Sequence, residues 1–212
     1  MEIIEMRAGS LLEDFDTLGM PPLMSVSPEL SFDILGRSLG GTFRQSSDGG
    51  TMHFNNPDCA EKSFVMVRPS VTNHRDVYLK FINSRYETNF SNSDLPQGFD
   101  VDHLLAKSNC PSTNWIRLEA VLSTINRSHG GGVEKRNSTS QVIKARKSAE
   151  HRPGSMTWLV AAKLAMIKSP LAQKAKSTSA RKEALVEYFV SRGFERNHVE
   201  VGITACQHDL AD

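Results

Sequence analysis

The chain has 212 residues, of which 39% are hydrophobic and 23% are charged, as is ordinary for a globular protein with one main core. No apolar run reaches the roughly 20 residues that a membrane span needs, so composition excludes a membrane-embedded protein. The net charge of +1 conceals an asymmetry, because residues 1–102 carry 8 basic and 15 acidic residues, whereas residues 103–182 carry 15 and 3. The basic segment favours a polyanionic partner, although a solvated lysine-rich surface would give the same counts.

The first 60 residues are expected to be irregular, with one short helix within Met1–Leu18, because proline and glycine pairs interrupt them. Two strands are predicted next, at Ser63–Arg68 and Val77–Ile82, where β-branched and aromatic residues are concentrated. A loop is predicted at Ser91–Gly98. The acidic N-terminus lacks a basic region followed by an apolar stretch, so no secretory signal is expected, and the three scattered cysteines favour a reducing compartment.

The centre of the chain is expected to fold in the order strand, loop, strand, helix. These elements are Phe99–Ala106, Lys107–Thr113, Trp115–Leu118 and Glu119–His129. Val121, Leu122 and Ile125 would give the helix one apolar face, and three glycines then end it.

The C-terminal part is predicted to be mainly helical. Helices are expected over Ser155–Lys168 and Thr178–Arg192, and the alternation of Val199, Val201 and Ile203 predicts a last strand. The fold class is therefore α+β.

Within Phe99–Gly131 an Asp102-His103 step is followed, 23 residues after the histidine, by an Asn126-Arg127 pair in the predicted helix. This pattern resembles the HNH, or ββα-metal, nuclease motif, in particular that of the HNH domain of CRISPR effector nucleases. The resemblance covers about a sixth of the chain. It implies a ββα-metal motif within a nuclease domain over residues 61–212, with residues 1–60 as an appendage.

The resemblance implies that His103 is the general base and that Asp102 and Asn126 hold Mg²⁺ or Mn²⁺. Asp100, on the same face of the strand as Asp102, and His129, on the same helix face as Asn126, are further candidate ligands. Asp100 could equally be a solvated carboxylate, and His129 a histidine favoured by the helix C-terminus.

Strict family spacing would place the middle asparagine of the motif at Arg117, so Asn114 is its substitute, unless it is a simple turn residue. An ideal strand also points Asp102 and His103 to opposite faces, so the site requires a bulge, a strong twist or a strand end there.

Seven basic residues are expected to follow the phosphate backbone of a nucleic acid, unless they serve only solubility. They are Lys107, Arg127, Lys135, Arg136, Lys144, Arg146 and Lys147. The remaining histidines have no partner at zinc-like spacing and are expected to be surface or core residues. They are His53, His74, His151, His198 and His208.

The sequence thus predicts a metal-dependent endonuclease acting on DNA rather than RNA. It would be a bacterial antagonism toxin, paired with an immunity or inhibitor protein, or a mobile-element nuclease. It would reside in the cytoplasm or be delivered into a target cell without a signal peptide, with no membrane partner. The alternatives are a non-catalytic nucleic-acid-binding protein that uses the basic segment, and a protein-interaction adaptor.

Overall fold

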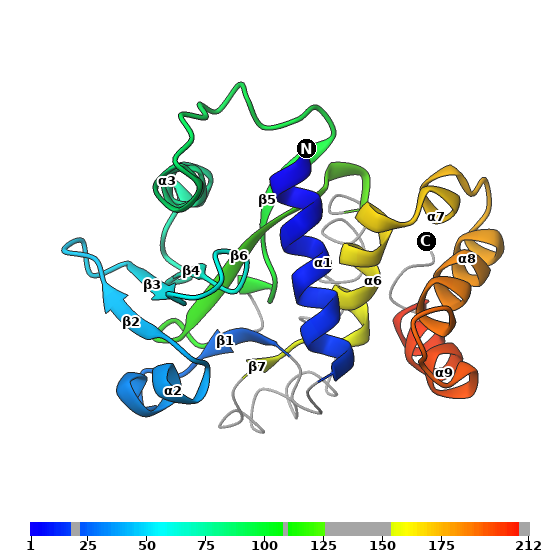
Figure 1. Ribbon diagram of the computed structural model, residues 1–212, viewed down its shortest axis with the longest axis horizontal. Helices are drawn as coiled ribbons and strands as arrows, with labels where there is room; N and C mark the ends of the chain where they lie inside the picture. The colour runs from blue at the N-terminus through cyan, green and yellow to red at the C-terminus, as the bar shows by residue number, and fades with distance from the viewer. Residues whose placement is uncertain (18–21, 108–109, 126–153, 208–212) are drawn as a thin grey trace. The chain divides into compact units, whose positions relative to one another are not determined.

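The structure is a computed structural model that describes residues 1–17, 22–107, 110–125 and 154–207 (Figure 1). Its contacts divide the chain into two compact units. The sheet unit comprises residues 23–120 and 138–155, and the helical unit comprises residues 1–22, 121–137 and 156–212. The described residues therefore form a mixture of helices and an antiparallel sheet, which confirms the α+β class.

The sheet unit is built on strands in the spatial order β2-β3-β4-β6-β1-β7, with β5 paired to β6 outside this path. Their bounds are Leu23–Val26 (β1), Thr42–Gln45 (β2), Thr51–Asn55 (β3), Phe64–Val67 (β4), Phe99–His103 (β5), Trp115–Leu122 (β6) and Gly154–Ser155 (β7). The strands predicted at Ser63–Arg68 and Phe99–Ala106 are confirmed as β4 and β5, each slightly shorter than expected.

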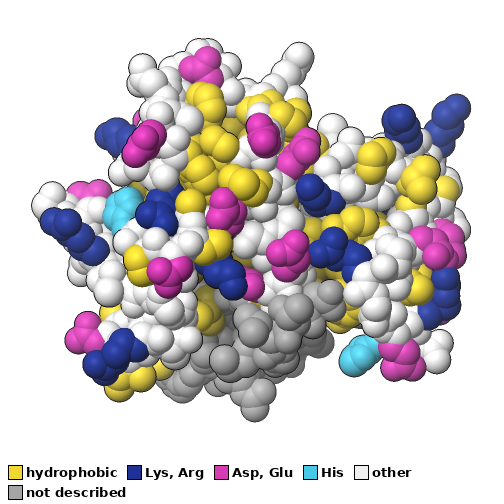
Figure 2. Space-filling view, viewed as in Figure 1, with side chains coloured by type: hydrophobic (Ala, Val, Ile, Leu, Met, Phe, Trp, Pro, Cys, Tyr) yellow, Lys and Arg dark blue, Asp and Glu magenta, His cyan; other side chains and the backbone are white. Residues whose placement is uncertain are grey.

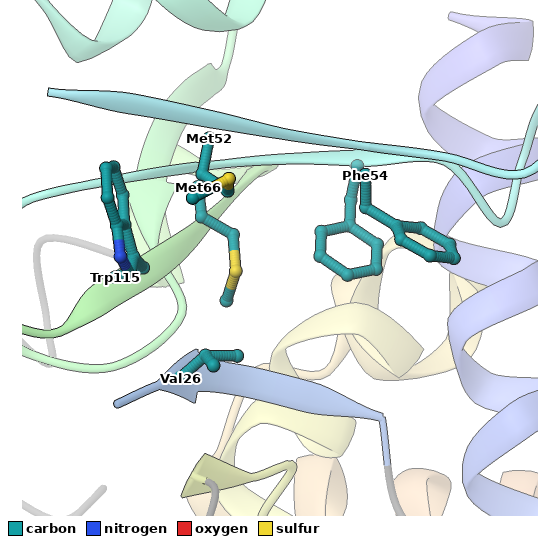
Figure 3. Packing of buried hydrophobic residues seen from close by; sticks show 6 residues of the cluster. Val26, Met52, Phe54, Met66 and Trp115 are labelled. Atoms are coloured by element: carbon teal, nitrogen blue, oxygen red, sulfur yellow. The ribbon is translucent and has the colours of Figure 1, made fainter. Parts of the chain in front are cut away.

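One face of this sheet carries the apolar core. The register sets Met52 opposite Met66, and Val26 opposite Trp115, so neighbouring strands direct their large side chains to the same side. Figure 3 shows the Met66 side chain extending toward Val26 of β1. Apolar residues of helix α2 (Phe32–Ser38) pack against the same cluster, so this core forms within the sheet unit alone.

Strand β6 is longer than predicted. The expectation was a strand at Trp115–Leu118 followed by a helix from Glu119, but the strand continues to Leu122 and helical residues begin only at Ser123. Every residue of β6 from Trp115 to Val121 is buried, so side chains on both faces of this central strand are covered. A doubly buried strand has no polar alternation, so its pattern can be mistaken for one face of a helix.

Helix α3 (His74–Tyr86) occupies the position where a strand was predicted over Val77–Ile82, and that prediction was wrong. Within this stretch the exposed Lys80 interrupts four buried residues, namely Tyr78, Leu79, Phe81 and Ile82. This spacing is helical, and the packing of α3 against β4 and β5 overrides the strand preference of its aromatic residues.

The helical unit contains α1 (Glu2–Thr17), α6 (Trp158–Lys168), α7 (Pro170–Lys174), α8 (Thr178–Val190) and α9 (Arg196–Gln207). The predicted helices at Met1–Leu18, Ser155–Lys168 and Thr178–Arg192 are confirmed as α1, α6 and α8. None of the helices in the described ranges is both long and apolar enough to cross a bilayer.

The last strand, predicted from Val199, Val201 and Ile203, was wrong, because this segment is helix α9. Val199 and Ile203 are fully buried, while Val201 is 69% exposed. Residues four apart share a helix face and residues two apart do not, so the burial follows the helical period although the sequence alternates.

Candidate functional site

The Asp102-His103 step lies at the end of strand β5. Burial alternates along this strand, since Phe99, Val101 and His103 are buried and the two aspartates are partly exposed. Asp102 and His103 therefore point to opposite sides of the strand. The strand ends at His103, and the following residue, Leu104, donates its N–H to the carbonyl of Arg117 in β6 at 3.0 Å. Of the three local arrangements expected there, the chain shows a strand end, and burial still alternates up to His103, so the two side chains stay on opposite sides.

The second half of the motif is only partly within the described residues. After β6, residues 123–125 are helical, so the chain order is strand, loop, strand and the start of a helix. The other predicted site residues, Asn126, Arg127, His129, Lys135, Arg136, Lys144, Arg146 and Lys147, lie outside the described ranges.

His103 is 7% exposed, and its imidazole lies against a second histidine ring. The His103 and His74 ring centroids are 4.6 Å apart, with the planes tilted by 55°. Burial lowers the pKa of His103 to about 3, and the charges of Lys107 and His74 act in the same direction. The Nε2 atom of His103 is buried without a hydrogen-bond partner. At neutral pH this side chain is an uncharged imidazole, and its burial makes it a weaker base than an ordinary histidine.

Lys107 holds the neighbouring loop in place. Its ammonium donates to the backbone carbonyl of Val71 at 3.0 Å, just ahead of the start of α3. His74 is the first residue of α3, which places its ring beside His103. The sequence predicted Lys107 as a phosphate contact but assigned His74 no role, because the two histidines are brought together by tertiary structure and not by motif spacing.

Asn114 lies in the loop that joins β5 to β6. Its backbone N–H donates to the carbonyl of Pro111 at 3.0 Å, and its side chain is hydrogen-bonded to the thiol of Cys110. Burial raises the pKa of Cys110 to about 11, so this thiol stays protonated and is a poor nucleophile. The structure therefore places Asn114 within the loop between β5 and β6.

Arg117, at the position that strict family spacing would assign to the middle asparagine, is part of a buried ion pair. Its Nη2 lies 2.8 Å from Oε1 of Glu119, and the two side chains are 5% and 3% exposed. The hydroxyl of Tyr78 donates to the other oxygen of Glu119 at 3.4 Å. This arrangement gives Arg117 a structural position inside the sheet unit.

Only some of the metal ligands implied by the family resemblance lie within the described residues. In the described ranges, no group of three or more His, Cys, Asp and Glu side chains is arranged to hold a metal ion. Asp100 and Asp102 share one side of β5 and are partly exposed, and carboxylate oxygens suit a hard cation such as Mg²⁺. Asp100 and Asp102 are thus the two predicted metal ligands that lie within the described residues.

Charge is mixed on one face of the described residues (Figure 2). On the face drawn in Figure 2, basic and acidic side chains are interspersed among the described residues and do not gather into a patch of one sign.

Comparison with protein-family models, with curated proteins and with solved structures finds no match to this chain.

Proposed function

We propose that the protein is a metal-dependent endonuclease that hydrolyses phosphodiester bonds, in DNA rather than RNA, with His103 as the general base. The observation that carries this proposal is the buried, uncharged His103 imidazole, whose Nε2 has no hydrogen-bond partner. A neutral imidazole can take a proton from water, and a metal ion that lowers the pKa of that water would offset the weak basicity of this buried ring. Its place in the Asp-His step, ahead of a paired strand and a helix start, also supports the proposal.

The proposed hydrolysis assigns a separate role to His103, Asp102 and Lys107. Nε2 of His103 accepts the proton of the attacking water, and burial keeps the imidazole from being protonated by bulk solvent. The family resemblance implies that Asp102 would hold Mg²⁺ or Mn²⁺, and the other implied ligand, Asn126, lies outside the described residues. The bound ion would stabilise the charge that develops on the phosphate and the leaving oxygen. Lys107 lies near the base and adds positive charge for the phosphate backbone.

Plasmid cleavage tests the proposal. The full chain is incubated with supercoiled plasmid in Mg²⁺, in Mn²⁺ and in EDTA, and His103→Ala is compared with His53→Ala. His53 is the control because it is also a histidine of the sheet unit, partly buried in β3, and no role in the reaction is assigned to it. We expect cleavage in metal and none in EDTA, with a loss of about 10²- to 10⁴-fold in His103→Ala alone.

Failure of the wild-type chain to cleave duplex DNA, single-stranded DNA and RNA would refute the nuclease. A salt-sensitive mobility shift without cleavage would instead support the non-catalytic nucleic-acid-binding protein. The biological setting, an antagonism toxin with an immunity protein or a mobile-element nuclease, belongs to the same proposal. Co-expression with a candidate immunity protein that abolishes cleavage would favour the toxin.

A further inference from the structure

Protonatable and cationic side chains meet at the N-terminal end of α3. His74 is the first residue of the helix, and the His103 ring lies 4.6 Å from its ring. The ammonium of Lys107 is bound to the carbonyl of Val71, three residues before the helix begins. The acidic residue of the first turn, Asp76, accepts a hydrogen bond from the side chain of Asn92 at 2.7 Å.

Two hydrogen-bonding atoms in this cluster have no partner. They are Nε2 of His103, in a side chain that is 7% exposed, and Nδ1 of His74. Buried polar atoms are normally paired, so these two nitrogens are available to a ligand or an ordered water. The helix start is also uncapped, because Asn73 makes no side-chain hydrogen bond to the first turn of this 13-residue helix. Its first N–H groups and its dipole favour an anion.

We propose that the N-terminal end of α3, together with His74 and Lys107, binds a phosphate group beside His103. That this phosphate belongs to a nucleic-acid substrate rests on the proposed function. An anion accepts hydrogen bonds from backbone amides, from an imidazole N–H and from an ammonium group at once. A metal cation would be repelled by Lys107 and by the positive end of the helix dipole, so the cluster selects an anion.

The three side chains differ in burial, which shows where the cluster is open to solvent. His103 is buried, whereas His74 and Lys107 are each partly exposed, so the cluster meets solvent at the latter two residues. A phosphate bound there contacts His74, Lys107 and the first amides of α3. Under the proposed function, the buried Nε2 of His103 would act on water beside this phosphate.

The test is titration of the full chain with inorganic phosphate in EDTA, followed by amide resonances in ¹H–¹⁵N spectra, with chloride at equal ionic strength as the anion control. His74→Phe keeps a ring against His103 but removes the imidazole nitrogens, and Lys107→Met removes the charge. Lys80→Met is the matched control, because Lys80 is an exposed lysine further along α3. We expect saturable shifts at residues 74–77, with affinity about tenfold weaker in His74→Phe and in Lys107→Met.

Equal phosphate affinity in all four proteins, or no saturable shift at the start of α3, would overturn the inference. Unfolding midpoints are measured for each variant, and if one variant is unfolded, the other decides the outcome. The plasmid assay keeps the two proposals apart. If phosphate binding depends on His74 and Lys107 but the chain cleaves no nucleic acid, the nuclease proposal is refuted and the anion site is supported. Cleavage without such binding would refute the anion site alone.

Discussion

Replacing Glu119 with Gln should destabilise the fold far more than an average substitution. Arg117 donates to Oε1 of Glu119 through both Nε, at 3.0 Å, and Nη2, at 2.8 Å. The guanidinium also lies 4.3 Å from the centroid of the Phe64 ring, and the Tyr78 hydroxyl donates to Glu119. The neutral amide would leave the buried guanidinium without its counter-charge, because both side chains are at most 5% exposed.

The expected loss follows from the burial of the pair. Removing one partner of a buried ion pair costs about 3–5 kcal/mol of unfolding free energy, because the remaining charge stays desolvated. This is a large fraction of the roughly 5–15 kcal/mol that stabilises a typical protein. With a urea m-value of about 2 kcal/mol/M, the midpoint should fall by about 2 M. Urea denaturation followed by circular dichroism measures this shift.

A double variant separates the ion pair from the packing around it. Arg117→Met combined with Glu119→Leu removes both charges and keeps apolar volume, so it should recover most of the stability that Glu119→Gln loses. Glu183→Gln serves as the exposed control, because its partner Arg196 is 43% exposed, and no measurable loss is expected. A midpoint in Glu119→Gln within about 0.5 M of the wild type would refute the reasoning, since a loss of about 1 kcal/mol is no more than an average substitution.

Two further predictions concern the other buried groups. The pKa of His103 is about 3 in the folded protein, below its ordinary value of 6.5. Between pH 3 and pH 6.5 the unfolded chain therefore binds a proton on this histidine that the folded chain does not bind. Stability should therefore be complete above pH 6.5 and fall toward pH 3, by at most about 1.4 kcal/mol per pH unit, as His74 and Lys107 beside it also oppose protonation. Urea midpoints at pH 7 and pH 5 should converge in His103→Gln, and an unchanged pH dependence would contradict this. Gly202→Ala should destabilise the protein by about 2 kcal/mol, because a Cβ at this position would lie 2.5 Å from the Trp158 ring. An unchanged melting temperature would contradict this prediction and show that the ring can shift without cost.

The local patterns of the sequence were sufficient where one element carries its own signal. The helices α1, α6 and α8 and the strands β4 and β5 were predicted, α6 and α8 from terminal residues and apolar spacing and β4 from its β-branched and aromatic content. The Asp102-His103 step was placed correctly at a strand because it lies in an alternating stretch, whose polar positions are partly exposed. The two aspartates and the histidine thus acquired their sides of β5 from the period of the strand alone.

Tertiary structure decided the remainder. The strand expected over Val77–Ile82 became helix α3, and the helix expected from Glu119 became the last part of β6, because packing on the sheet outweighs local preference. The contact between His74 and His103, which carries the anion site, joins residues 29 positions apart. No periodicity within one element reports such a contact, because it arises only when α3 packs on the sheet and brings its first residue to the end of β5.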